Sequence, residues 1–262
     1  ITSFFVNQST GSLTSATSNP ATGTSGLVID SGGTFLYSLN ATTNLVETYV
    51  LNALTGSATF VSSTTSGGTG PNFIAMHGNG QLLYIANSTA GNVSAFVVNP
   101  STGAVTLLGQ STLAVARGVA VDPFGRFVYA TDNTSVLKVF RIAANGSLTQ
   151  ISTVATGVFN TFVATTPDGR FVYTTNQTSN DVSVLYVQDN GILLNLANRP
   201  AGSGPIGISV EPTGKFLFVG NAGAGTVMVY SINRLTGDIT LVDTKAAAAG
   251  SQSIAFSNRY SF

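Results

Sequence analysis

The chain has 262 residues, enough for one large all-β domain, and its 10 acidic and 10 basic side chains give no net charge. Balanced charge excludes a general nucleic-acid binder, which needs a basic surface, and it excludes recruitment to acidic lipids. With no cysteine and one histidine, disulfides, thiolate metal sites and most imidazole chemistry are excluded too.

The first element predicted in chain order is a strand over Ser3–Asn7, followed by a Thr10-Gly11 turn and a second strand. A pattern Gly-x-(Phe/Leu)-(Leu/Val)-(Tyr/Phe) then recurs every 44 to 47 residues. Its copies are Gly33–Tyr37, Gly80–Tyr84, Gly125–Tyr129, Gly169–Tyr173, Gly214–Phe218 and a degenerate Asn258–Phe262. A second glycine recurs with about the same spacing, at Gly11, Gly56, Gly103, Gly146, Gly191 and Gly237. The chain therefore contains six copies of one unit.

The fourth unit illustrates the strands that each copy is expected to form. Alternating or β-branched runs occupy Phe162–Thr165, Arg170–Thr174, Val182–Val187 and Ile192–Leu196. The pattern excludes a helical solenoid, and a β-helix would have a shorter repeat. Four antiparallel strands in each unit of about 45 residues predict an all-β protein, a β-propeller of six four-stranded blades.

The two ends of the sequence each supply half a unit. Ser3–Asn7 aligns with Thr48–Asn52 in a third strand, whereas Asn258–Phe262 ends on a second strand. We therefore predict one domain over residues 1–262, in which residues 1–18 and 251–262 share a blade. The strands expected to meet there carry Ser3, Phe4, Phe5, Val6, Arg259, Tyr260 and Phe262. The halves can pair within one chain, or between copies arranged head to tail in a filament.

Two stretches of the repeat resemble a known family. Phe171–Asn176 followed by Asn180–Val184 resembles the YVTN-type propeller repeat. Asp122–Tyr129 and Leu235–Thr240 are similar to repeats of the lactonase-like propellers of the 6-phosphogluconolactonase type, and the likeness extends over the whole chain. The resemblance implies a propeller fold and, as activity, hydrolysis of a sugar lactone. Members of that family have seven blades, whereas the repeat here predicts six, and none of their catalytic residues has a match.

Several polar residues keep step with the repeat and are expected to stabilise turns. Asp30, Asp122 and Glu211 lie three residues before the repeated glycine, and His77 occupies the same slot. A second series follows each repeated aromatic residue by three positions: Asn40, Asn87, Asp132, Asn176 and Asn221.

The mouth of the central channel is the usual ligand site of a propeller. The residues that lead into the innermost strands are, in register, Ser25, Asn72, Arg117, Thr161 and Ile206, with Asn160 adjacent. Because Arg117 is the charged member, Arg117, Asn72 and Asn160 are the candidate ligand-binding residues, for a small anion or a sugar. We predict no catalytic residue, no metal ligand and no cofactor.

The composition, and the lack of predicted catalytic residues at the channel mouth, decide between the functional hypotheses. Charged residues make up 8 % of the chain, which with abundant Ser, Thr, Asn and Gly favours an extracellular or cell-surface protein; a cytosolic one is the alternative. We expect a non-enzymatic scaffolding propeller whose partner is itself, through strand exchange into filaments. The alternatives are a lactonase-like hydrolase acting on a sugar lactone and a carbohydrate- or peptide-binding module. No nucleic acid partner is expected, and no membrane insertion, since no run of about 18 apolar residues exists.

Overall fold

The computed structural model describes residues 1–7, 9–10, 12–18, 23–247, 250 and 253–254. Within these residues every regular element is a β-strand. The strands form five four-stranded sheets and one two-stranded sheet, and neighbouring strands of a sheet are antiparallel. In the described part of the chain there is no helix that is long and apolar enough to cross a membrane.

Each four-stranded sheet follows the order of the chain, so its strands are joined by consecutive turns. The two-stranded sheet is β1 (Thr2–Val6) and β2 (Leu13–Ser18). The first four-stranded sheet contains β3 (Thr24–Ile29), β4 (Phe35–Asn40), β5 (Leu45–Leu51) and β6 (Ala58–Thr65), and the second contains β7 (Pro71–Met76), β8 (Leu82–Asn87), β9 (Asn92–Val98) and β10 (Val105–Thr112). The third contains β11 (Val119–Val121), β12 (Phe127–Thr131), β13 (Val136–Ile142) and β14 (Leu148–Ala155), and the fourth contains β15 (Asn160–Thr165), β16 (Phe171–Asn176), β17 (Asp181–Val187) and β18 (Leu193–Pro200). The fifth contains β19 (Pro205–Val210), β20 (Phe216–Asn221), β21 (Thr226–Ile232) and β22 (Ile239–Ala246).

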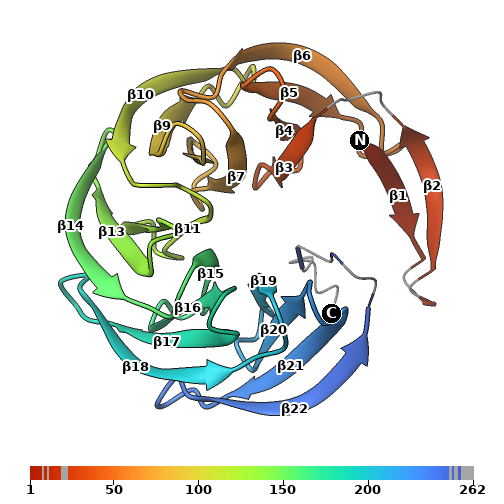
Figure 1. Ribbon diagram of the computed structural model, residues 1–262. Coiled ribbons are helices and arrows are strands. Elements are labelled where there is room, and N and C mark those ends of the chain that lie inside the picture. Colours follow the sequence, from red (N-terminus) through yellow and green to blue (C-terminus); the bar gives the residue numbers. More distant parts are fainter. Residues whose placement is uncertain (8, 11, 19–22, 248–249, 251–252, 255–262) are drawn as a thin grey trace.

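The sheets are arranged as the blades of a propeller (Figure 1). The first strand of each four-stranded sheet lies innermost and the fourth lies at the rim, while the β1–β2 hairpin lies at the rim between the first and the last of these blades. The predicted repeat of four antiparallel strands is thereby confirmed for five units. The strands of the fourth unit also run longer than predicted, since β18 continues to Pro200.

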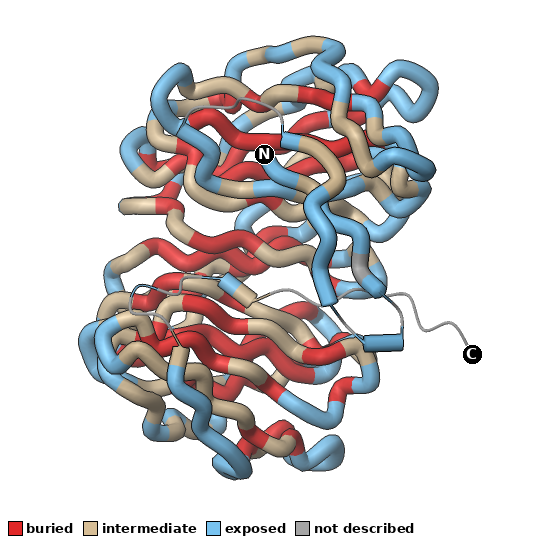
Figure 2. The backbone as a smooth tube through the Cα atoms, turned by 90° about the vertical axis from the view of Figure 1, so that its right-hand side faces the viewer, coloured by how far each residue is buried: buried red, intermediate tan, exposed pale blue. Residues whose placement is uncertain are grey.

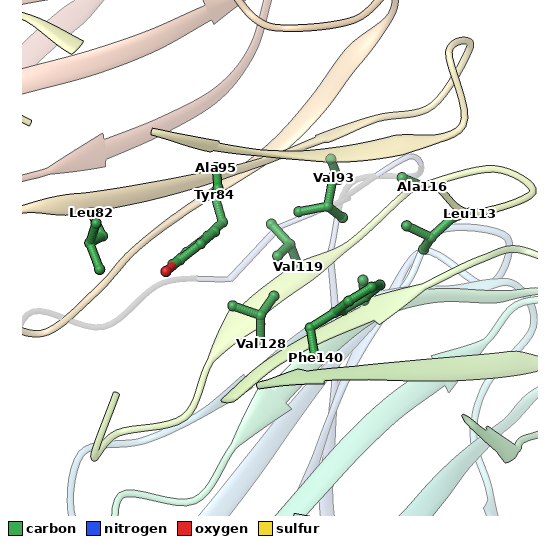
Figure 3. Close-up of a cluster of buried hydrophobic side chains, with 11 residues drawn as sticks. Leu82, Tyr84, Val93, Ala95, Leu113, Ala116, Val119, Val128 and Phe140 are labelled. Atoms are coloured by element: carbon green, nitrogen blue, oxygen red, sulfur yellow. The ribbon is translucent and has the colours of Figure 1, made fainter. Parts of the chain in front are cut away.

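The hydrophobic core lies between neighbouring blades rather than at one centre. In one cluster Leu82 and Tyr84 of β8 pack with Val119, Val128 and Phe140 of the next blade (Figure 3). The second strands of the first four complete blades are buried along their length, whereas the rim strands and turns are largely exposed (Figure 2). A strand buried on both faces reads as a continuous apolar run, which explains why the repeated pattern was so regular.

In four of the five four-stranded blades, a glycine in the turn before the rim strand packs against a large side chain of the preceding blade. Gly103 has a φ of 71°, and a Cβ atom on it would lie 2.4 Å from the ring of Phe35. Only glycine combines this left-handed conformation with so close an approach. The same contact recurs between the turn and the first residue of the preceding blade's second strand, as Gly146 with Leu82, Gly191 with Phe127 and Gly237 with Phe171.

The predicted turn-capping role is confirmed for the slot three residues before the repeated glycine and for Asn40 and Asp132 of the second series. In that series Asn87, Asn176 and Asn221 instead donate to residues of the third strand, and their side-chain oxygens have no partner among the described residues. The Asp30 Oδ1 atom accepts hydrogen bonds of 2.7 Å from the backbone N–H groups of Thr34 and Phe35. His77 works in the same slot, because its Nδ1 accepts the N–H of Asn79 at 3.1 Å and its Nε2 lies 3.2 Å from the carbonyl oxygen of Gly125. The histidine therefore joins two turns of neighbouring blades.

Candidate functional site

Neutral polar side chains at the start of the inner strands link one blade to the next. The Ser25 hydroxyl donates to the carbonyl of Pro71 at 2.6 Å. The Asn72 amide donates to the carbonyl of Arg117 at 2.9 Å, and the Thr161 hydroxyl to that of Pro205 at 3.4 Å. Each of these bonds crosses from one inner strand to the beginning of the following one, at its first residue or just before it. The predicted channel positions thus hold the ring of inner strands together.

One residue further along the inner strands, glycine and phenylalanine alternate around the ring. Phe73 of β7 and Phe162 of β15 face each other with ring centroids 4.7 Å apart, although β11 lies between their strands. The residue of the intervening blade at this level is Gly118, which is buried. A Cβ atom there would lie 2.6 Å from the carbonyl oxygen of Thr161. The missing side chain allows the two phenyl rings to form an apolar pair next to the lead-in residues.

Arg117 is the charged residue at this end of the inner strands, and its side chain is half-buried. Its guanidinium carbon lies 5.1 Å from the centroid of the Phe159 ring, within the range of a cation–π interaction. The Arg117 Nε atom is buried and has no hydrogen-bond partner among the described residues. Arg126 and Arg199, in contrast, form ion pairs with carboxylates at 2.9 and 2.6 Å. Arg117 therefore provides a guanidinium that no described carboxylate neutralises.

Phe159 occupies a position that glycine takes in other blades. Its φ is +64°, and its carbonyl accepts the N–H of Gln177 at 2.9 Å. Gly70 and Gly204, with φ of 65° and 60°, accept the corresponding bonds from Ser88 and Ala222. A bulky residue in the left-handed region is an outlier, and such strain is concentrated at functional sites. Alignment of the repeat would have exposed this substitution, whereas composition and charge would not.

Asn160, the third predicted ligand residue, is buried in a local network. Its amide nitrogen donates to the carbonyl of Val136 at 2.7 Å and to the Thr156 hydroxyl at 3.1 Å. Its side-chain oxygen accepts the N–H of Asn133 at 2.9 Å. The structure therefore joins Arg117 with Asn72 through a direct hydrogen bond and with Asn160 only through the adjacent Phe159.

The shifted carboxylates of the chain lie in turns and at the rim. Burial acts to raise the pKa of Glu211, but hydrogen bonds from the hydroxyl and N–H of Thr213 and the N–H groups of Lys215 and Phe216 outweigh it and lower the pKa. The hydrogen bonds from Arg199 lower the pKa of Asp238. Among the described residues no group of three His, Cys, Asp or Glu side chains could hold a metal ion.

The fold and this site define a class of protein, a β-propeller with a cation at the end where its inner strands begin. The chain belongs to the lactonase family, described as seven-bladed β-propellers, whose sequence profile matches residues 2–123 and 160–256. The unmatched interval contains β12 to β14 and ends on Phe159. No curated protein matches the chain.

Solved structures of several bacterial proteins are similar to this fold. A protein of unknown function from Desulfotomaculum acetoxidans is 16 % identical with a TM-score of 0.79, over 92 % of this chain and 75 % of its own. A protein provisionally described as a 6-phosphogluconolactonase from Bacteroides fragilis is 17 % identical with a TM-score of 0.64, over 95 % and 91 %. The periplasmic gluconolactonase of Pseudomonas aeruginosa is 15 % identical with a TM-score of 0.59, over 95 % and 93 %. At these identities the likeness establishes the fold.

Proposed function

We propose that this chain is a lactonase-family hydrolase that acts on a sugar lactone at the end of the inner strands that carries Arg117. The observation that carries the proposal is the pairing of two departures from the repeat. Arg117 stands where other blades have Ser, Asn, Thr or Ile, and the ring beneath it, Phe159, stands where three other described blades have glycine. Family membership supplies the substrate class.

In the proposed reaction Arg117 stabilises the negative charge that develops on the substrate's carbonyl oxygen. In lactone hydrolysis water adds to the carbonyl carbon and produces a tetrahedral oxyanion. The ring C–O bond then breaks, the released ring oxygen takes a proton from the attacking water, and a hydroxy acid is formed. A preorganised donor aimed at such an oxyanion is worth roughly 100- to 1,000-fold in rate. The Arg117 guanidinium, which forms no ion pair with a described carboxylate, would supply positive charge for this role.

The test is hydrolysis of gluconolactone, followed by acid release at constant pH. We expect turnover above the spontaneous rate, and a loss of about 100-fold in kcat/KM for Arg117→Gln. The matched control is Arg141→Gln, because Arg141 is also stacked on a ring, that of Phe127 at 5.5 Å, but lies in β13. The proposal is wrong if the wild-type protein shows no turnover, or if both variants lose activity equally.

The extracellular filament expected from the sequence receives no support from the comparisons, which favour the hydrolase alternative. Location outside the cell stays a prediction. We also infer that the chain forms six blades in one domain. This count is supported by five four-stranded sheets, the β1–β2 hairpin beside them, and the sixth copy of the repeat at Asn258–Phe262, which lies outside the described residues.

A further inference from the structure

A crevice lies between the turns of the first two four-stranded blades. Its volume is about 200 Å³, and Asp30, Phe35, Tyr37 and Pro100 are among the residues that line it. Asp30 follows the inner strand β3, whereas Arg117 precedes the inner strand β11. The crevice therefore lies at the opposite end of the inner strands from the proposed lactone site.

The corresponding crevice between the fourth and fifth four-stranded blades is almost filled. Its volume is about 20 Å³. Each residue that lines it corresponds, through the repeat, to a residue that lines the larger crevice. The side chains differ in size, since Pro167 and Asp168 stand where the first blade has Ser31 and Gly32. The repeat therefore leaves open at one junction a space that it fills at another.

An arginine crosses the junction of the fourth and fifth four-stranded blades. Arg170 donates from its two terminal nitrogens to the carbonyls of Arg234 and Leu235, at 2.9 and 3.3 Å. Its guanidinium carbon lies 5.3 Å from the centroid of the Phe171 ring. A ring on one side and turn carbonyls on the other thus hold a planar cation here.

The third blade holds a second arginine at the corresponding position. Arg126 forms a two-pronged pair with the Asp122 carboxylate, with nitrogen–oxygen distances of 2.9 and 3.1 Å. Its guanidinium carbon lies 5.3 Å from the centroid of the Phe127 ring. The capping carboxylate of a blade can therefore bind a guanidinium while its oxygens also accept backbone N–H groups.

The first blade has the partners for such a guanidinium but not the arginine. Thr34 occupies the position of the two arginines, four residues after the capping residue. Asp30 and Phe35 provide the corresponding carboxylate and ring, and the carbonyls of Pro100 and Ser101 correspond to those that Arg170 contacts. Within the described part of the chain Asp30 forms no ion pair. The carboxylate in this crevice thus has no cation of its own.

A buried hydroxyl in the same crevice also lacks a partner. Tyr37 is fully buried, and its hydroxyl forms no hydrogen bond with the described residues. In two other blades the equivalent hydroxyl donates to a turn carbonyl, at 3.1 Å from Tyr84 and at 2.8 Å from Tyr173. Since an unsatisfied buried hydroxyl costs free energy, a ligand rich in N–H donors would gain by reaching it.

We propose that this crevice binds a guanidinium group, carried by a small alkylguanidine or by the arginine side chain of a partner. The planar cation lies over the Phe35 ring and donates N–H groups to the Asp30 carboxylate and the Pro100 carbonyl. Guanidinium is preferred to ammonium, because only a planar fork gives two parallel N–H groups to a carboxylate while it stacks on a ring.

Titration with ethylguanidinium, followed through the backbone amide signals in NMR spectra, tests the site. We expect saturable shifts at Gly32, Asn79 and Gln81, which line the crevice, and none with ethylurea, which has a similar shape without the charge. Asp30→Asn should weaken binding about 10- to 100-fold, because the amide keeps an oxygen for the turn and loses the charge. The control, Asp189→Asn in an exposed turn of another blade, should bind as the wild type does.

Thr34→Arg is the second variant, because it returns to the first blade the side chain that the third blade has. Its own guanidinium should fill the crevice, abolish the shifts and leave the melting temperature no lower than that of the wild type. The proposal is overturned if the wild-type protein shows no saturable shift, if ethylurea binds equally well, or if Thr34→Arg binds as the wild type does.

Two larger probes distinguish the sources of the guanidinium. Tighter binding of agmatine than of N-acetylarginine methylamide would identify a free metabolite, and the reverse order would identify an arginine of a protein partner; either order supports the proposed class. None of these measurements depends on lactone hydrolysis, so this proposal and the proposed function fail separately.

Discussion

The guanidinium of Arg117 lies over the ring of Phe159, with its carbon atom 5.1 Å from the ring centroid. The arginine precedes the inner strand of one blade, and the phenylalanine precedes the inner strand of the next. The contact therefore joins two neighbouring blades. It also holds a cation beside the start of the inner strands, at a position where the backbone is in a left-handed conformation that phenylalanine rarely adopts.

This strain leads to a prediction for Phe159→Gly. Relief of the left-handed conformation, about 1–2 kcal/mol, should offset loss of the cation–π contact, about 0.5–2 kcal/mol. We therefore expect the free energy of unfolding to change by about 1 kcal/mol or less, while kcat/KM for gluconolactone falls about tenfold. Urea denaturation and the acid-release assay measure the two quantities.

Phe159→Ala is the matched control, because alanine loses the ring and keeps the strain. It should be less stable than the glycine variant by about 1 kcal/mol. Equal stability of the two variants would show that the left-handed conformation at this position costs nothing. Unchanged activity in both would remove Phe159 from the proposed site.

Gly118 makes a second prediction possible, about the packing of the inner strands. A Cβ atom on Gly118 would meet the carbonyl oxygen of Thr161 at 2.6 Å and the Phe162 Cα atom at 2.9 Å. Because both are backbone atoms of a packed strand, they cannot move aside cheaply, and Gly118→Ala should lower the free energy of unfolding by about 1–3 kcal/mol. Gly109→Ala in β10 is the control, since no atom lies within 4 Å of its added Cβ.

Denaturation by urea distinguishes the two glycines. Gly109→Ala should leave the midpoint unchanged or raise it slightly, because alanine restricts the unfolded chain. A Gly118→Ala protein as stable as the wild type would mean that β11 and β15 can separate without cost. The apolar pair of Phe73 and Phe162 would then not depend on a glycine between them.

A third prediction concerns the repeated tyrosines of the second strands. The Tyr173 hydroxyl is buried and donates to the carbonyl of Gly237 at 2.8 Å, whereas the buried Tyr37 hydroxyl has no partner among the described residues. Tyr173→Phe should therefore cost about 1 kcal/mol of stability, since it removes one buried hydrogen bond. Tyr37→Phe should be neutral or stabilising, and thermal unfolding of both variants provides the comparison. Equal losses would contradict the difference in hydrogen bonding.

Particular residues show which contacts of the fold and of the candidate site can be predicted from the sequence. Asp30 and the glycines of the turns act within a few residues of their own position, so a repeated local pattern predicted them correctly. The contact of Phe73 with Phe162 joins strands two blades apart, and it depends on the curvature of the ring. No local pattern carries that information. The position of Asn160 in the repeat predicts a ligand residue, but its hydrogen bonds to Val136 and Thr156 depend on the path of two loops.

The last prediction is a loss of stability in alkaline solution. Burial, with the nearby Asp30 carboxylate, raises the pKa of Tyr37 to about 12, and burial alone does so for Tyr230. Burial also raises the pKa of Tyr84 and Tyr173 above the usual value of 10.0. Because the unfolded chain loses these protons first, the stability contributed by the protonated phenols is complete below about pH 10 and is lost as the pH rises through the folded-state values.

Urea denaturation at about pH 8 and about pH 11, with tyrosinate absorbance as a second probe, measures this effect. We expect a lower midpoint at the higher pH and a sharp rise of tyrosinate that coincides with unfolding. The Tyr37→Phe variant should lose less stability over the same interval, because one of the shifted phenols is gone. A wild-type midpoint that is the same at both pH values, or tyrosinate that forms gradually in the folded protein, would contradict the burial of these hydroxyls between the blades.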